Sequence, residues 1–435
     1  MKLAGKRGKL HGKMERPNIL WIVTTQWRAQ ACGYAGDANA RTPCLDALAS
    51  ESVNFAQAVT PHPMGPMARA ALLTGVPSPG NGVREYFDPL PTGARTIAHE
   101  LRERGYATAF FGKWGVGKRD PAVPLVGEAA ARVIVPERER GGFDFWEGFE
   151  GGFQLNDPWL HGSRIEGTRQ FAGYQSDVLC ARAGGWIAEC GMRSAESLIQ
   201  NPQSKIQNVQ PWFVVVSLES PHPPYDAGAA GVTACDPAKI TLRENVPSGH
   251  HGAARARREL AGYYAHIEAT DRAIGSLLDV ATNNCVVVFT SVHGDMHGAH
   301  GLFRKGWPHE ESVRVPLLVR HPAKRARRDD AAVSLLDVAA MTLAWADKRK
   351  WVASGMAAHI SMPSVVALPH QCDRAWRGVR TRTRKLVLNA AHSTGSGQDG
   401  SPWLFFDLEH DPLEMDNRVS DPARAAEIAE LARLT

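Results

Sequence analysis

The chain has 435 residues, of which 43% are hydrophobic and 22% charged, a composition typical of a globular protein with a large buried core. No apolar run approaches the ~18 residues that a membrane-spanning helix needs. The formal net charge of +5 is carried by five basic residues near the start, so the remaining chain is neutral, which argues against a nucleic-acid-binding surface.

These basic residues lie within positions 1–13, which contain no acidic residue: Lys2, Lys6, Arg7, Lys9 and Lys13. We expect residues 1–15 to form a basic disordered tail, with Met14 as an alternative start. A tether to an anionic surface is the other interpretation. No apolar segment follows the basic residues, so no signal peptide is predicted.

Seven cysteines lie far apart and form no C-x-x-C pair: Cys32, Cys44, Cys180, Cys190, Cys235, Cys285 and Cys372. An odd number without close spacing argues against a disulfide framework and against a zinc site. We therefore expect a reducing compartment, and the cytoplasm is the predicted location.

Short apolar runs alternate with helical patterns through most of the chain. The predicted strands are 18–23, 53–56, 108–111, 211–218, 285–290 and 315–319, and the predicted helices are 42–49, 96–105, 176–190 and 259–280. This alternation predicts an α/β fold whose mostly parallel sheet has helices on both faces. Residues 120–170 are rich in Gly, Pro and charge, and we expect a loop-rich surface insertion there.

The pattern changes near residue 346. Two apolar runs, 386–388 and 403–408, indicate antiparallel strands, and 422–434 indicates a closing helix. We predict an α/β domain over residues 16–345 and a small α+β subdomain over residues 346–435.

One stretch, Thr60–Gly75, indicates a loop that turns into a helix. Its prolines and glycine prevent regular structure at first, and the good helix formers around Arg69 follow. A helix N-terminus behind a tight loop favours an anion, and Arg69 adds a positive charge. Between Thr60 and Thr74 there is no Ser, Thr, Cys, Asp, Glu or Lys that could act as a nucleophile.

Several motifs occur in an order that resembles the sulfatase family of the alkaline-phosphatase superfamily. They are RPNILWIVT, TPCLDALASESVNFAQAV, RAALLTG, TAFFGKWG, GFDFWEG, SPHPPYD, HGLFRKG, WRGVRTRTRK and FDLEHDPLEM. The resemblance covers residues 16–417. The resemblance implies an alkaline-phosphatase-like, mixed but mostly parallel sheet between helices. It also implies a formylglycine nucleophile made from Cys or Ser, a divalent cation, usually calcium, and Lys, His and Arg side chains that hold a sulfate ester.

Some family positions match in this chain and others do not. The matching substrate-binding residues are Arg69, Lys113 and Lys305, with His222 as a catalytic residue and Gln26 and His293 as metal ligands. The nucleophile position is Gly65 if aligned on Arg69, or Met64 if aligned on Pro66. Thr25 and Val292 replace the two metal carboxylates, and Gly115 replaces a histidine.

Formylglycine cannot form at Gly or Met, and a calcium site without carboxylates loses the charge that sets its affinity. The resemblance therefore predicts a catalytically impaired sulfatase-like protein, with no calcium, whose only expected partner is a small anionic ester. The alternative is a divergent hydrolase of sulfate or phosphate esters in which His222 or His293 activates water. A rebuilt metal site in the HGDMHGAH segment (293–300) is a further alternative.

Overall fold

The computed structural model describes residues 16–200, 210–249, 251–281, 284–352, 356–390 and 400–435, and side chains 193–200 are left out. The predicted tail over 1–15 lies outside these residues. Within the described ranges, no helix has both the length and the apolar character needed to cross a membrane.

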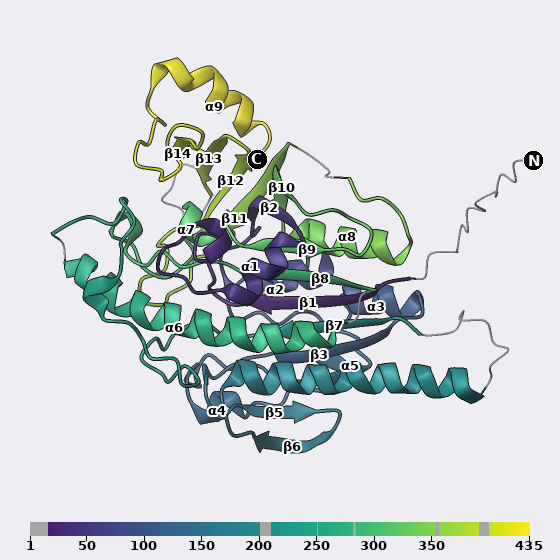
Figure 1. Cartoon of the computed structure of the whole chain (residues 1–435). Helices are drawn as coiled ribbons and strands as arrows, with labels where there is room; N and C mark the ends of the chain where they lie inside the picture. The colour runs from purple at the N-terminus through teal and green to yellow at the C-terminus, as the bar shows by residue number, and fades with distance from the viewer. Residues whose placement is uncertain (1–15, 201–209, 250, 282–283, 353–355, 391–399) are drawn as a thin grey trace, which may run out of the picture.

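The main sheet has ten strands in the order β10-β2-β9-β8-β1-β7-β3-β4-β5-β6 (Figure 1). Their bounds are β1 Asn18–Thr24, β2 Val53–Val59, β3 Ala107–Lys113, β4 Phe145–Phe149, β5 Trp159–Gly162, β6 Ile165–Gln170, β7 Trp212–Ser217, β8 Cys285–Ser291, β9 Leu317–Arg320 and β10 Arg327–Ser334. All six strands predicted in this region are present, whereas β4, β5, β6 and β10 were not predicted.

The centre of the sheet is parallel. Ile19 of β1 pairs with Phe213 of β7 on one side and with Val286 of β8 on the other. Strand β3 continues the parallel arrangement beside β7, whereas β9 is antiparallel to both of its neighbours. The carboxyl ends of β1, β3, β7 and β8 therefore meet at one edge, where open α/β sheets place their ligand sites.

Alternate residues of β1 enter two different cores. Ile19 and Trp21 pack with α2 Gly65–Thr74, α3 Ile97–Glu103 and α8 Leu336–Ala346. Leu20 and Ile22 pack with α1 Pro43–Ser50, α5 Gln175–Gln200 and α6 His251–Val280. Figure 1 shows α5 and α6 side by side along one face. The sheet is thus covered on both faces, which explains why its central strands are continuous apolar runs.

The expectation of a loop-rich surface insertion over 120–170 is wrong. This segment contains α4 Glu128–Ala131 and supplies β4, β5 and β6, and β4 pairs in parallel with β3. Its glycines reflect close backbone approach and not loops alone: a Cβ at Gly148 would lie 2.2 Å from the carbonyl oxygen of Gly112.

The second sheet is antiparallel, in the order β11-β12-β13-β14. Its strands are β11 Ala357–Met362, β12 Trp376–Thr381, β13 Arg384–Asn389 and β14 Pro402–Asp407, and α9 Ala425–Ala432 packs against it. The strands predicted at 386–388 and 403–408 and the closing helix are confirmed, whereas β11 and β12 were missed.

This second sheet also holds a loop of the main domain. Buried Lys385 lies 2.8 Å from Glu310 at the start of α7 Glu310–Val313 and 2.6 Å from Glu414. Its ammonium donates a hydrogen bond to the carbonyl of Pro308 (2.9 Å), and the indole of Trp376 donates one to Gly306 (2.8 Å). The loop anchored in this way is the one that carries Lys305.

Candidate functional site

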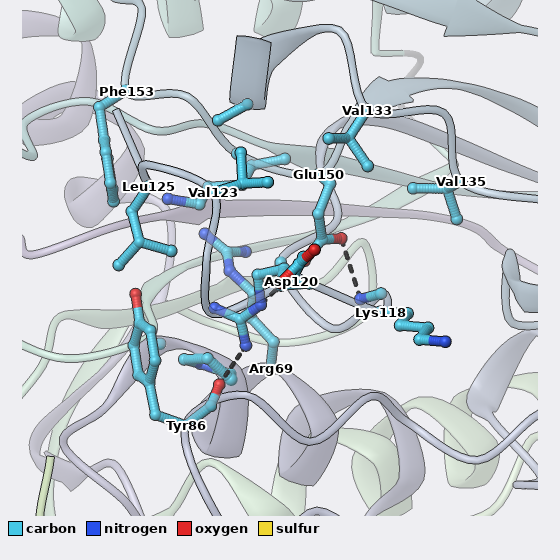
Figure 2. Close-up of a pocket in the computed structure, with 18 of the residues that line it drawn as sticks. Arg69, Tyr86, Lys118, Asp120, Val123, Leu125, Val133, Val135, Glu150 and Phe153 are labelled. Atoms are coloured by element: carbon cyan, nitrogen blue, oxygen red, sulfur yellow. Dashed lines mark hydrogen bonds and ion pairs between the residues drawn. The ribbon is translucent and has the colours of Figure 1, made fainter. Parts of the chain in front are cut away.

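A cavity of about 470 Å³ opens at the carboxyl edge of the main sheet (Figure 2). Its base collects residues that are far apart in sequence and that follow or end different strands. Those among the sequence-predicted residues that line it are Thr25, Gly65, Arg69, Lys113, Gly115, His222, His293 and Lys305. The structure thus brings together nearly all of the predicted site, and the role of each residue stays a prediction.

Helix α2 begins at Gly65, two residues earlier than the sequence indicated, and no side chain caps its first turn. Arg69 lies one turn further in and is buried. Its guanidinium donates hydrogen bonds to the hydroxyls of Ser217 (2.6 Å) and Thr25 (2.5 Å). Burial lowers the pKa of Arg69 to about 10, so the side chain is still cationic at neutral pH.

Lys113, the last residue of β3, donates a hydrogen bond to the fully buried carboxylate of Glu219. The Lys113 ammonium also lies 4.5 Å from the centre of the Phe153 ring, a cation–π contact. Burial lowers the pKa of Lys113 even though Glu219 acts in the opposite direction. An anion entering the cavity would therefore share this cation with Glu219.

Lys305 connects two of the predicted residues. Its ammonium donates to the side-chain oxygen of Gln26 (2.6 Å) and to Nε2 of His222 (3.0 Å). Because Nδ1 of His222 is bound to the carbonyl of Pro223 (2.8 Å), the imidazole is neutral with its proton on Nδ1. Burial, followed by the charge of Lys305, holds the pKa of His222 well below its ordinary value. Burial also lowers the pKa of Lys305 to about 7.

His293 faces Gly65, one of the two positions predicted for the nucleophile. Nδ1 contacts the carbonyl of Gly294 (2.9 Å), so Nε2 carries the free lone pair, and this buried atom has no hydrogen-bond partner. A Cβ added at Gly65 would lie 4.0 Å from it. Burial keeps the pKa of His293 well below its ordinary value, which makes it a neutral imidazole at pH 7.

The structure gives a local environment for the three other positions predicted to differ from the family. Gly115 has φ +66°, and a Cβ there would lie 2.9 Å from Cδ of Arg69. Val292 is fully buried in the apolar core that also contains Met64 and Met67. At the first carboxylate position, the hydroxyl of Thr25 donates to the carbonyl of Leu218 (2.9 Å).

Among the described residues, the HGDMHGAH segment does not form a metal cluster of its own, although its last residue, His300, lies near two glutamates from elsewhere in the chain. Asp295 instead accepts hydrogen bonds from the side chains of Gln26 and Tyr225, the latter at 2.7 Å. Burial raises the pKa of Asp295, but the nearby imidazole of His297 and guanidinium of Arg304 outweigh it, so that the pKa lies below its ordinary value. Asp295 is thus an internal partner of Gln26.

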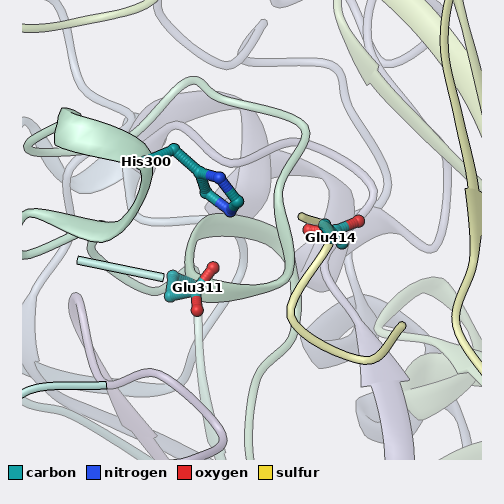
Figure 3. A group of neighbouring side chains, drawn as sticks. All are labelled: His300, Glu311 and Glu414. Carbon is teal, nitrogen blue, oxygen red and sulfur yellow. The ribbon is translucent and has the colours of Figure 1, made fainter. Parts of the chain in front are cut away.

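Two groups of His, Asp and Glu in the described residues have ligand atoms within 4.8 Å of one another, and neither lies in the cavity. One consists of Asp407, Glu409 and His410 at the end of β14. The other is His300, Glu311 and Glu414 (Figure 3). Its acids are already paired, Glu311 with Asn245 and Glu414 with Lys385.

The profile of the sulfatase family matches residues 17–348. The chain belongs to the sulfatase family. An ulvan-active sulfatase from Formosa agariphila is 35% identical over 318 residues, which are 71% of this chain and 56% of that protein. An arylsulfatase from Clostridium perfringens is 25% identical over 93% of this chain and 90% of its own length. A putative sulfatase from Bacteroides fragilis has the same fold, with a TM-score of 0.78, 23% identity and 98% and 96% coverage.

This sulfatase-family protein also has cavity residues that the motifs did not reveal. Glu150, directly after β4, is buried, and its carboxylate accepts a hydrogen bond from the backbone of Gly117 (2.9 Å). Burial raises the pKa of Glu150 to about 7. Glu219, which does not line the cavity but binds the lining residue Lys113, was missed as well, although it lies two residues after the end of strand β7.

Proposed function

We propose that this sulfatase-family protein binds a sulfate ester or a similar anion and does not hydrolyse it by the formylglycine route. The observation that carries the proposal is that the two positions predicted for the family nucleophile are Gly65, which has no side chain, and Met64, which cannot become formylglycine. A buried, unpartnered imidazole nitrogen of His293 faces Gly65. Losing a catalytic nucleophile can cost roughly 10⁶ in kcat.

The polar groups present do not fit the calcium ion that the family implies. Calcium prefers several oxygen ligands with carboxylates among them. The side-chain oxygen of Gln26 accepts from the ammonium of Lys305, and the hydroxyl of Thr25 accepts from Arg69. Val292 presents an apolar side chain to the core. We therefore derive no step through a metal.

Anion binding is supported by the cations that remain. Arg69, Lys113 and Lys305 all line the base of the cavity, close to the uncapped N-terminus of α2. Their charges and the helix dipole act on an anion in the same direction. The named activities of the relatives favour a sulfate head group.

The seven free cysteines support a cytoplasmic location.

The test is to measure binding and turnover on the same protein. Inorganic sulfate and 4-nitrophenyl sulfate should protect the protein against thermal unfolding. Arg69→Ala should weaken the affinity for each of the two anions by at least tenfold. We expect no release of 4-nitrophenol above the level of a mock purification. Turnover that Lys113→Ala abolishes would refute the proposal.

A second function has one specific observation in its favour. Nε2 of His293 is a neutral, unpartnered base beside the vacant nucleophile position, which is what a group that activates water needs. The lone pair of His222 already accepts from Lys305, so His293 is the better candidate. We would then expect slow hydrolysis of aryl sulfate, phosphate or phosphonate esters.

That alternative is tested by substituting His293→Gln and His222→Gln separately. If water is activated at His293, the first substitution removes hydrolysis and the second leaves a measurable rate. If neither the wild-type protein nor the His222→Gln variant hydrolyses any of the three ester classes, with or without added divalent metal, the binding function is favoured.

A further inference from the structure

One wall of the cavity comes from the segment between β3 and β4 and is aliphatic. The lining residues from this segment that carry only carbon in their side chains are Val123, Pro124, Leu125, Ala130, Val133, Ile134, Val135 and Pro136. In Figure 2, Val123, Leu125, Val133 and Val135 lie along the upper part of the pocket, and Arg69 lies at its lower part. The cavity thus has a cationic base and an apolar wall.

This wall is held in place by backbone contacts of the segment. The backbone N–H of Gly127 donates to the carbonyl of Gly152 (3.0 Å), and that of Val135 donates to Nε2 of His161 (3.1 Å). The guanidinium of Arg140 donates to the carbonyl of Val135 (3.1 Å). The segment that presents the aliphatic side chains is therefore bonded to the loop after β4 through Gly127 and to β5 through Val135.

Several of these side chains are exposed in spite of being apolar. Ile134 is 52% exposed, and Val123 and Val133 are 38% and 36% exposed. Grouped exposed apolar residues on a soluble protein commonly mark a binding site, because covering them removes apolar surface from water. Here they border a cavity whose base carries the proposed anion site.

Two polar residues of the upper cavity, Arg119 and Asp120, are engaged with their own chain, and the charged side chains of Lys118 and Arg138 also line the cavity. The guanidinium of Arg119 lies 4.6 Å from the centre of the Tyr86 ring and 3.4 Å from the carboxylate of Glu150. Asp120 accepts from the backbone of Ala122 (2.9 Å). A sugar ring needs several free donors and acceptors, whereas an apolar group needs none.

We infer that the ester bound by this protein has an apolar alcohol part, an alkyl or aryl group and not a sugar. The inference rests on the proposed function, because the anionic head is placed at Arg69, Lys113 and Lys305. A volume of about 470 Å³ is in the range of pockets that enclose whole small molecules, which leaves ample room beyond the head group. The apolar part lies against Leu125, Val133 and Ile134.

The test compares inorganic sulfate, methyl, butyl and octyl sulfate, 4-nitrophenyl sulfate and glucose 6-sulfate by calorimetry on the full chain, with octyl sulfate below its micelle concentration. We expect affinity to rise roughly two- to fourfold per methylene as the alkyl chain covers the wall. The affinity of 4-nitrophenyl sulfate, compared with those of the alkyl sulfates, shows whether the site prefers an aryl or an alkyl group. Glucose 6-sulfate should bind more weakly than butyl sulfate.

A variant distinguishes binding at the aliphatic wall from non-specific hydrophobic binding. Ile134→Asn should weaken octyl sulfate binding at least fivefold more than it weakens inorganic sulfate binding. The matched control is Val352→Asn, which changes an exposed valine outside the cavity and should change neither affinity. If inorganic sulfate binds but methyl and octyl sulfate bind equally, or glucose 6-sulfate binds best, the inference is overturned and the proposed function stands. If no anion binds at all, both are overturned.

Discussion

The ammonium of Lys305 lies 2.6 Å from the side-chain oxygen of Gln26 and donates a hydrogen bond to it. The two residues are 279 positions apart, and the contact joins the end of β1 to the loop after β8. Gln26 also donates to the buried carboxylate of Asp295, so its orientation is fixed, with the oxygen toward Lys305. The side-chain oxygen of Gln26, a residue predicted as a metal ligand from the family resemblance, is therefore already bound by an ammonium group.

The first prediction is that calcium does not stabilise this protein. A ligand that binds the folded state raises its stability by RT ln(1 + [L]/Kd), so a specific site would show as a shift in Tm. We expect the Tm to change by less than about 1 °C between EDTA and millimolar calcium. One equivalent of calcium in the purified protein, or a Tm several degrees higher with calcium, would contradict this prediction.

The second prediction concerns the buried pair of Lys113 and Glu219. Lys113→Met leaves the Glu219 carboxylate buried without its partner, which typically costs about 3–5 kcal/mol of unfolding free energy. Adding Glu219→Gln should recover most of that stability but not the affinity for sulfate. Urea denaturation and sulfate calorimetry measure the two effects.

The surface pair of Arg95 and Glu103 provides the control for this experiment. Both side chains are more than half exposed and Arg95 also pairs with Glu100 on the surface, so Arg95→Met should change the stability little compared with Lys113→Met. If the double variant at 113 and 219 is as unstable as Lys113→Met alone, the account of an uncompensated Glu219 is incorrect.

The third prediction is that position 115 must be glycine for the side chain of Arg69 to keep its position. Gly115→Ala places a Cβ 2.9 Å from Cδ of Arg69 at a φ of +66°, so the arginine must move. We expect a loss of about 1–3 kcal/mol in stability and a weaker affinity for sulfate. Gly36→Ala is the control, since Gly36 has φ +86° but nothing within 4 Å of a Cβ. It should lower stability modestly and leave sulfate affinity unchanged.

The sequence was sufficient for the strands that build the centre of the fold. The run at 211–218 is continuous and apolar because β7 is covered on both faces, and it is recognisable without a structure. Strand β10 was missed because Arg327–Ser334 begins with four charged residues, as an edge strand can. The glycine-rich segment of β4 was misread because its glycines serve close strand contacts.

The site was predictable only where strand ends or family motifs mark it. Lys113 and His222 follow recognisable apolar runs, whereas Glu150 follows a strand that the sequence analysis took for a loop. The aliphatic wall at 123–136 could not be placed, because no local pattern says that this segment faces the cavity. Nor does spacing reveal that Lys305 reaches Gln26, since only the tertiary fold brings them together.

The last prediction is that sulfate affinity falls as the pH rises through about 7. Burial raises the pKa of Glu150 to about 7, so this carboxyl is mostly neutral at pH 6 and negatively charged at pH 8. The new negative charge repels an anion. Lys305, whose pKa burial lowers to about 7, loses its positive charge over the same range, which acts in the same direction. His222 and His293 have pKa values well below 6.5 and do not change charge in this range.

We expect the Kd for sulfate to rise about tenfold, equivalent to about 1.4 kcal/mol, between pH 6 and 8. Calorimetry should show a shallower dependence of Kd on pH for Glu150→Gln, because this carboxyl then no longer titrates. The dependence should be unchanged for Glu103→Gln on the surface of α3. A Kd that is constant or that falls with pH would contradict this assignment of charge in the cavity.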